Sequence, residues 1–66
     1  MNIGEKLRFI REHEGFKLRE LASRSGIHEN SLSNYEKGRR EPKYSYVEWI
    51  LEAMGYELVI QRRKQK

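Results

Sequence analysis

The stretch LRELASRSGIHENSLSNY, residues 18–35, contains two short segments of helical pattern on either side of a glycine. Ala22 lies in the first segment, and its small side chain lets two short helices cross closely at a steep angle. Gly26 follows four residues later and tolerates the positive φ that a tight turn between such helices tends to need. The spacing therefore predicts two helices joined by a short turn.

The second segment has an apolar side and a polar side. Ile27, Leu32 and Tyr35 are spaced to face the core. The opposite side consists of Glu29, Asn30, Ser33 and Asn34. This pattern predicts a helix-turn-helix at about residues 18–36, and in that motif the outer face of the second helix enters the major groove of DNA.

The composition describes one small domain without covalent cross-links. The chain has 66 residues and no cysteine, and His13 and His28 are isolated, so we expect no disulfide, no metal site and no cofactor. A domain of this size buries only about 60% of its unfolded surface, so dimerisation would add stability. No apolar run is long enough for a membrane span or a signal peptide, which predicts a cytoplasmic protein without membrane contact.

The net charge of +4 is unevenly placed along the chain. Arg62, Arg63, Lys64 and Lys66 lie near the C-terminus, and the remaining body has ten basic and ten acidic residues. A second basic cluster, consisting of Lys37, Arg39, Arg40 and Lys43, follows the second helix of the motif. Such clusters are commonly a solvated surface, but the position beside a helix-turn-helix favours contact with DNA phosphates.

Apolar spacing and capping residues predict four helices, at about residues 3–14, 18–25, 28–37 and 45–54. Asn2 is the expected N-cap of the first helix, while Gly15 and Gly38 end the first and the third. Ser45 and Glu48 predict a capping box at the start of the fourth. The expected fold is therefore all-α, in a DNA-binding domain that covers residues 1–55.

Residues 56–61 read YELVIQ, which alternates like a β-strand, and the rest of the chain offers no second strand. Pairing with the same strand of a second copy across a two-fold axis would satisfy its backbone groups. With a second apolar stripe on the fourth helix, this predicts a homodimer interface of Tyr46, Trp49, Ala53, Tyr56, Leu58, Val59 and Ile60. The alternative is an extended tail packed on its own domain, with Trp49 capping the core. We expect residues 62–66 to form a disordered basic tail.

The sequence GFKLRELASRSGIHENSLSNYEKGRREP, residues 15–42, resembles the phage repressor and Cro-like helix-turn-helix family, also called the XRE family. The resemblance extends over residues 3–54 and rests on Arg11, the Leu-Ala pair, the glycine of the turn and the ending YEKGRREP. It implies a compact lambda-repressor-like bundle of four or five helices. The C-terminal segment looks like the dimerising β-strand that some members append.

The resemblance also implies an ion pair between an arginine of the first helix and the glutamate that ends the recognition helix. Here these are Arg11 and Glu36, and such a pair fixes geometry more than it adds stability. The alternative is two separate surface charges.

Two positions depart from the family pattern. Leu18 stands where a glutamine often holds a phosphate, so Lys17 or Arg19 would replace that contact. His28 stands where a serine or threonine often caps the recognition helix. It would either cap weakly, remain a plain surface residue or reach a phosphate.

Carried over by position, the residues that would read bases are Glu29, Asn30, Ser33 and Asn34. Asparagine can form two hydrogen bonds with adenine, and glutamate can accept one from cytosine N4. The alternative role for Glu29 is a favourable charge at the helix N-terminus. The expected phosphate contacts are Lys17, Arg19, His28, Ser31, Lys37, Arg39, Arg40 and Lys43.

These patterns predict a sequence-specific regulator of transcription that binds double-stranded DNA as a homodimer and acts as a repressor. One alternative is an antitoxin that binds a toxin partner and represses its own operon. Another is a protein-interaction module of the same fold that does not bind DNA, which Leu18 and Glu29 favour weakly. We expect no enzyme, because no nucleophile, metal or glycine-rich phosphate loop accompanies the carboxylates.

Overall fold

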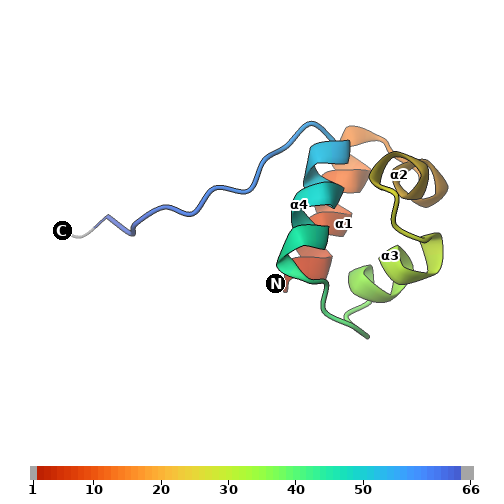
Figure 1. Cartoon of the computed structure of the whole chain (residues 1–66), viewed down its shortest axis with the longest axis horizontal. Helices are drawn as coiled ribbons and strands as arrows, with labels where there is room; N and C mark the ends of the chain where they lie inside the picture. Colours follow the sequence, from red (N-terminus) through yellow and green to blue (C-terminus); the bar gives the residue numbers. More distant parts are fainter. Residues whose placement is uncertain (1, 65–66) are drawn as a thin grey trace.

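A computed structural model describes residues 2–64 as four α-helices followed by an extended C-terminal segment (Figure 1). The helices are α1 (Ile3–Glu14), α2 (Leu18–Ser25), α3 (Glu29–Glu36) and α4 (Tyr44–Ala53). The all-α class is confirmed, and each helix begins and ends within one residue of its predicted bounds. Four helices agree with the expected four or five, and residues 2–64 of this single chain contain no β-strand.

Local hydrogen bonds explain where α1 begins and ends. The Oδ1 atom of Asn2 accepts the Glu5 N–H at 2.8 Å, and the Glu5 carboxylate accepts the Asn2 N–H at 3.2 Å. This capping box satisfies two backbone donors that a helix leaves free at its start. Gly15 ends the helix in the left-handed conformation, with φ of 81°.

The start of α4 differs from the expected capping box. The helix begins at Tyr44 with Lys43 as its N-cap, and Lys43 forms no side-chain capping bond. Ser45 lies inside the first turn instead of before it. The buried apolar side chains of α4 determine how the helix packs on the core. The helix therefore begins at Tyr44, one residue before the start that the capping chemistry of Ser45 predicts.

The turn between α2 and α3 has the geometry that its sequence predicts. Gly26 has φ of 77°, and its N–H donates to the Ala22 carbonyl at 3.0 Å. The next N–H, of Ile27, donates to Ser25 Oγ at 3.2 Å. Both donors at the turn are therefore paired, and α2 and α3 pack against each other.

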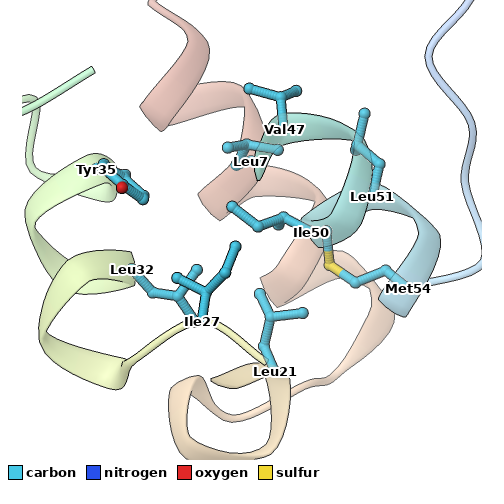
Figure 2. Packing of buried hydrophobic residues seen from close by; sticks show 9 residues of the cluster. All are labelled: Leu7, Leu21, Ile27, Leu32, Tyr35, Val47, Ile50, Leu51 and Met54. Atoms are coloured by element: carbon cyan, nitrogen blue, oxygen red, sulfur yellow. The ribbon is translucent and has the colours of Figure 1, made fainter. Parts of the chain in front are cut away.

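All four helices contribute to one small core. Figure 2 shows nine buried side chains that point toward one another. They are Leu7, Leu21, Ile27, Leu32, Tyr35, Val47, Ile50, Leu51 and Met54. α3 packs on α1 and α2, and α2 packs on α4. The core therefore contacts α3 only along its inner face.

The first turn of α1 lies directly against the end of α3. A Cβ atom added to Gly4 would stand 1.8 Å from the Tyr35 carbonyl oxygen, which is far inside van der Waals contact. Gly4 is buried, so the two backbones meet there without an intervening side chain. A glycine in the first turn of α1 thus fixes how closely α1 approaches the end of α3.

The C-terminal segment leaves the helical body after α4. Gly55 has φ of 85°, and the Tyr56 N–H donates to the Leu51 carbonyl at 2.9 Å, which closes the helix end. Beyond this point residues 57–64 are extended and form no backbone hydrogen bond, and they run away from α3 (Figure 1). The predicted strand 56–61 is not formed because the described chain supplies no neighbouring strand. Of the predicted basic tail 62–66, residues 62–64 are extended and exposed, and 65–66 lie outside the described residues.

Every helix in residues 2–64 is too short and too polar to cross a lipid bilayer.

Replacing Gly4 by alanine should destabilise the fold although alanine is the better helix former. The gain in helix propensity is about 1 kcal/mol, whereas overpacking against a fixed backbone atom costs about 1–3 kcal/mol or more. Urea unfolding should show a net loss of stability. Ser23→Ala, at an exposed position of α2, is the control and should not lower stability; equal behaviour of both variants would contradict the close approach of α1 and α3.

Candidate nucleic-acid interface

The outer face of α3 carries the four residues predicted to read bases. Glu29 and Asn30 are exposed, while Ser33 and Asn34 are half-buried. Among residues 2–64, none of these four side chains forms an intramolecular hydrogen bond, so their donors and acceptors are uncommitted. Leu32 and Tyr35 lie on the opposite face, in the core. The structure therefore places the four polar side chains on one helix and outside the core.

The first turn of α3 is not capped by a side chain. His28 is the N-cap residue, is exposed, and forms no side-chain capping bond. Backbone N–H groups at the start of a helix that lack such a cap are available to a bound anion. The carboxylate of Glu29 lies in the same turn, where the helix dipole favours its negative charge.

The two helices of the motif form one surface at this end of α3. A shallow depression is lined by Arg19 and Ser23 of α2 together with Ile27, His28 and Glu29. Arg19 is exposed, so its guanidinium can reach a phosphate that lies beside the start of α3. Three phosphate contacts were expected near α2 and the turn, from Lys17, Arg19 and His28. The structure brings Arg19 and His28 together at this depression. Lys17 is exposed at the N-cap of α2.

Leu18 does not belong to this surface. Its side chain is half-buried and packs against the core. The position that a glutamine often occupies in the family is therefore used for packing, and any phosphate contact must come from the neighbouring cations.

The basic cluster lies directly after α3. All four of its side chains are exposed: Lys37, Arg39, Arg40 and Lys43. Gly38 has φ of 75°, and the Arg39 N–H donates to the Asn34 carbonyl at 2.9 Å, so the chain turns sharply at the end of α3. This turn places Lys37, Arg39 and Arg40 directly after the last residue of α3, and Lys43 follows at the start of α4.

Two members of the cluster lie against neighbouring residues. Lys43 Nζ lies 5.5 Å from the centre of the Tyr46 ring, a distance at which a cation is attracted to the aromatic face. Arg40 lines a shallow pocket with Asn2 and Gly38, next to the start of α1. The cluster therefore extends from the end of α3 to the starts of α1 and α4.

An ion pair attaches the end of α3 to α1. Arg11 Nε donates to Glu36 Oε2 at 2.7 Å, and a second guanidinium nitrogen donates to Glu36 Oε1 at 2.9 Å. The third nitrogen donates to the Phe16 carbonyl at 2.9 Å. The two side chains are only 14% and 8% exposed, so the pair is largely buried. The hydrogen bonds that Arg11 donates to Glu36 are the main cause of the raised pKa of Arg11, against the opposing effect of burial. The structure thus contains the pair that the family resemblance implied.

The residues predicted for a dimer interface fall on two surfaces. On α4, Trp49 is 48% exposed and contacts Tyr46 in a tilted arrangement with ring centres 5.3 Å apart, and Ala53 is half-buried beside it. On the C-terminal segment, Val59 and Ile60 are exposed. The remaining two, Tyr56 and Leu58, are held to the body of the protein.

The attachment of Tyr56 was not predicted. Its hydroxyl donates to Glu14 Oε2 at 2.8 Å, and this bond is the main cause of the raised pKa of the Tyr56 hydroxyl. Leu58 packs against the core from the same side of the segment. No local pattern could reveal a contact between residues 42 positions apart.

A second exposed aromatic was also missed. Phe9 is 64% exposed and stacks on His13 with ring centres 6.2 Å apart. Its position off the apolar stripe formed by Ile3, Leu7 and Ile10 is a signal that the sequence does contain. Among the residues that the structure describes, no three potential ligands lie together to hold a metal ion.

Comparison with known proteins agrees with this geometry. A family model described as a helix-turn-helix domain matches residues 4–59. Two solved structures of the clp gene regulator ClgR from Corynebacterium glutamicum are each 34% identical over 83% of this chain, with TM-scores of 0.80 and 0.79. The matches cover 71% and 58% of those two chains. No curated protein matches the chain.

The fold and the exposed face of α3 define a DNA-binding regulator of transcription of the helix-turn-helix class. The family model covers most of the chain, so the chain belongs to the helix-turn-helix domain family. The resemblance to the phage repressor and Cro-like (XRE) family is thereby confirmed.

Breaking the Arg11–Glu36 pair should destabilise the fold strongly. Arg11→Ala leaves a largely buried carboxylate without its partner, and the expected loss is about 3 kcal/mol in urea unfolding. The matched control is Arg8→Ala on the same helix. Arg8 also pairs with a glutamate, Glu12, at 3.2 Å, but both side chains are more than half exposed. Its loss should stay below about 1 kcal/mol. Similar losses for the two arginines would contradict the special role of the buried pair.

Proposed function

We propose that the chain is a sequence-specific repressor that binds double-stranded DNA as a homodimer, with α3 in the major groove. The observation that carries this proposal is the outer face of α3. It presents amide, hydroxyl and carboxylate groups that no other part of the described chain uses, and exposed cations lie directly beside it. Polar readers flanked by phosphate-binding cations are the arrangement that sequence-specific recognition of DNA requires.

The reading groups on α3 differ in the base that each prefers. Asn30 and Asn34 can each form two hydrogen bonds with the major-groove edge of adenine, and Glu29 can accept one from cytosine N4. Ser33 can donate to or accept from either kind of edge. The two asparagines lie four residues apart on the helix and therefore on the same face, which suits neighbouring base pairs.

The cations at both ends of α3 would fix the register of the protein on the duplex. Lys37, Arg39, Arg40 and Lys43 follow the helix, while Arg19 and His28 lie at its start. Ser31, in the first turn of α3, would add a neutral hydrogen-bond donor, and Lys17 lies farther away at the start of α2. Contacts to phosphates position a protein on DNA but carry no sequence information themselves. The helix is thus placed between two sets of anchors, with its outer face toward the groove.

The neutral body of the protein supports specific rather than general binding. Apart from the C-terminal cations, the chain has ten basic and ten acidic residues, so the body carries no net positive charge that would attract any duplex. Sequence-independent binding rises with the number of phosphates that a protein neutralises. Without a general positive charge on the body, discrimination between duplexes would rest on the base contacts of α3.

The homodimer is supported by apolar side chains that one chain leaves in water. Ile60 is 83% exposed and Val59 is 58% exposed, on a segment whose backbone groups have no partner. A two-fold dimer presents two copies of α3, which would meet half-sites about 34–36 Å apart, one helical turn of DNA, or a multiple of that.

The test is selection of bound duplexes from a random pool, together with sedimentation of the free protein. We expect an enriched two-fold symmetric sequence, because two copies of α3 read equivalent half-sites. Failure to enrich any duplex at low ionic strength would instead leave a protein-interaction module of the same fold.

Asn30→Ala should relax specificity at one position of each half-site. Removing a two-bond contact to a base costs roughly 1–3 kcal/mol at that position and little elsewhere. The measurement is competition binding with duplexes substituted one base pair at a time. Glu52→Gln, on the exposed outer face of α4, is the control and should not change the preference. A uniform loss over all duplexes would show that Asn30 does not read a base.

Arg39→Ala should weaken binding to every duplex by a similar factor. Each phosphate contact contributes about 0.9 to the slope of log affinity against log salt concentration, so the slope should fall by about that amount. Arg63→Ala removes the same side chain from the segment that runs away from α3 (Figure 1) and should leave the slope unchanged. If Arg39 and Arg63 behave alike, the basic cluster is not the anchor.

A further inference from the structure

The C-terminal segment combines an anchored first half with a free second half. Tyr56 is bound to Glu14 and Leu58 packs on the core, whereas Val59 and Ile60 are exposed. Within the described part of the chain, no backbone group of residues 57–64 forms a hydrogen bond. An extended segment of this kind pairs readily with another strand.

We propose that two copies pair these segments as antiparallel strands with Val59 on the two-fold axis. This register rests on the homodimer proposed above and specifies how its two chains meet. It places Leu58 of each chain opposite Ile60 of the other and Tyr56 opposite Arg62.

Symmetry restricts the choice of register to a few cases. In an antiparallel pair around a two-fold axis, one residue must lie opposite its own copy, and paired residues share a face of the sheet. Because side chains alternate along a strand, moving the axis by one residue puts the side chain of the central residue on the opposite face of the sheet. The candidates for the central residue are therefore residues 58, 59, 60 and 61.

The backbone excludes the register centred on Leu58. With the axis at Leu58, a strand as long as residues 56–62 would begin at Gly55, which has φ of 85° and closes α4. Extended strands need negative φ, and the hydrogen bond from the Tyr56 N–H to the Leu51 carbonyl would have to break.

Side-chain pairing favours Val59 over the two later positions. With Ile60 or Gln61 at the centre, an arginine would lie opposite Leu58 or Ile60 on the face that covers the core. A register centred on Ile60 does bring Glu57 opposite Arg63, but exposed ion pairs contribute little. With Val59 at the centre, Leu58 and Ile60 from both chains form one apolar face, and that face continues the side from which Leu58 already packs on the core.

The flanking pairs agree with this choice. Tyr56 lies opposite Arg62, where a guanidinium can lie against an aromatic ring. Glu57 lies opposite Gln61 on the outer face, where both remain in water. The register therefore pairs apolar with apolar at the centre and keeps the cations Arg63 and Lys64 beyond the paired strands.

The test uses single-cysteine variants of the full chain, which has no cysteine of its own. Directly opposite residues have Cα atoms about 4.5–5.5 Å apart, within the range of about 4.4–6.8 Å that a disulfide bridges. Residues one pair off lie about 7–8 Å apart. In oxidised glutathione, Val59→Cys should therefore give a linked dimer at least about tenfold faster than Leu58→Cys, Ile60→Cys or Gln61→Cys.

A mixture provides an independent readout that leaves Val59 intact. Leu58→Cys and Ile60→Cys chains, mixed and oxidised, should link to each other faster than either links to itself. Both readouts are made on non-reducing gels, with helical content checked by circular dichroism to confirm folding.

Each other outcome overturns the register. Fastest linking at Leu58→Cys, Ile60→Cys or Gln61→Cys places the axis at that residue, and equal linking at residues 58–61 indicates parallel or sliding strands. Slow linking of all variants in a protein that sediments as a dimer and binds DNA places the interface elsewhere and leaves the proposed function intact. A monomer that binds no duplex refutes the proposed function itself.

Discussion

The ion pair between Arg11 and Glu36 is the interaction on which the position of the recognition helix depends. α3 has eight residues and is held by the core along only one face, so its far end needs a second attachment. Arg11 supplies it with two bonds to Glu36 and one to the Phe16 carbonyl. One guanidinium thus joins α1, the connection to α2 and the end of α3. Largely buried charge pairs of this kind fix geometry even where their net contribution to stability is small.

A second constraint acts at the same end of α3. Gly4 brings the backbone of α1 against the Tyr35 carbonyl, so α3 cannot slide along α1 without a steric clash. Together, the glycine contact and the ion pair fix both the distance and the orientation of α3. The polar side chains on its outer face can therefore remain free of internal bonds and still be held in one place, which is what recognition of a groove requires.

Most of the helical framework could be predicted because its signals are local. Apolar spacing, the Asn2 cap and the glycines after α1 and α2 gave helix bounds within one residue of those observed. The start of α4 was predicted less well, because Ser45 has the chemistry of a cap but the packing of α4 places Lys43 there. The C-terminal strand was predicted from alternation alone, yet a strand needs a partner, and residues 2–64 of one chain contain none. Contacts such as Tyr56 with Glu14 have no local signature at all.

The sequence alone determined the helix-turn-helix, because Ala22, Gly26 and the apolar positions act within one or two turns of backbone. It also determined which polar residues share the outer face of α3, since helical periodicity assigns faces. Only the tertiary structure decided that Leu18 packs on the core, that Gly4 is the contact point of two helices, and that the C-terminal segment is anchored at Tyr56 and free beyond Leu58. These features depend on distances between residues far apart in the chain, and such distances are fixed only when the helices pack together.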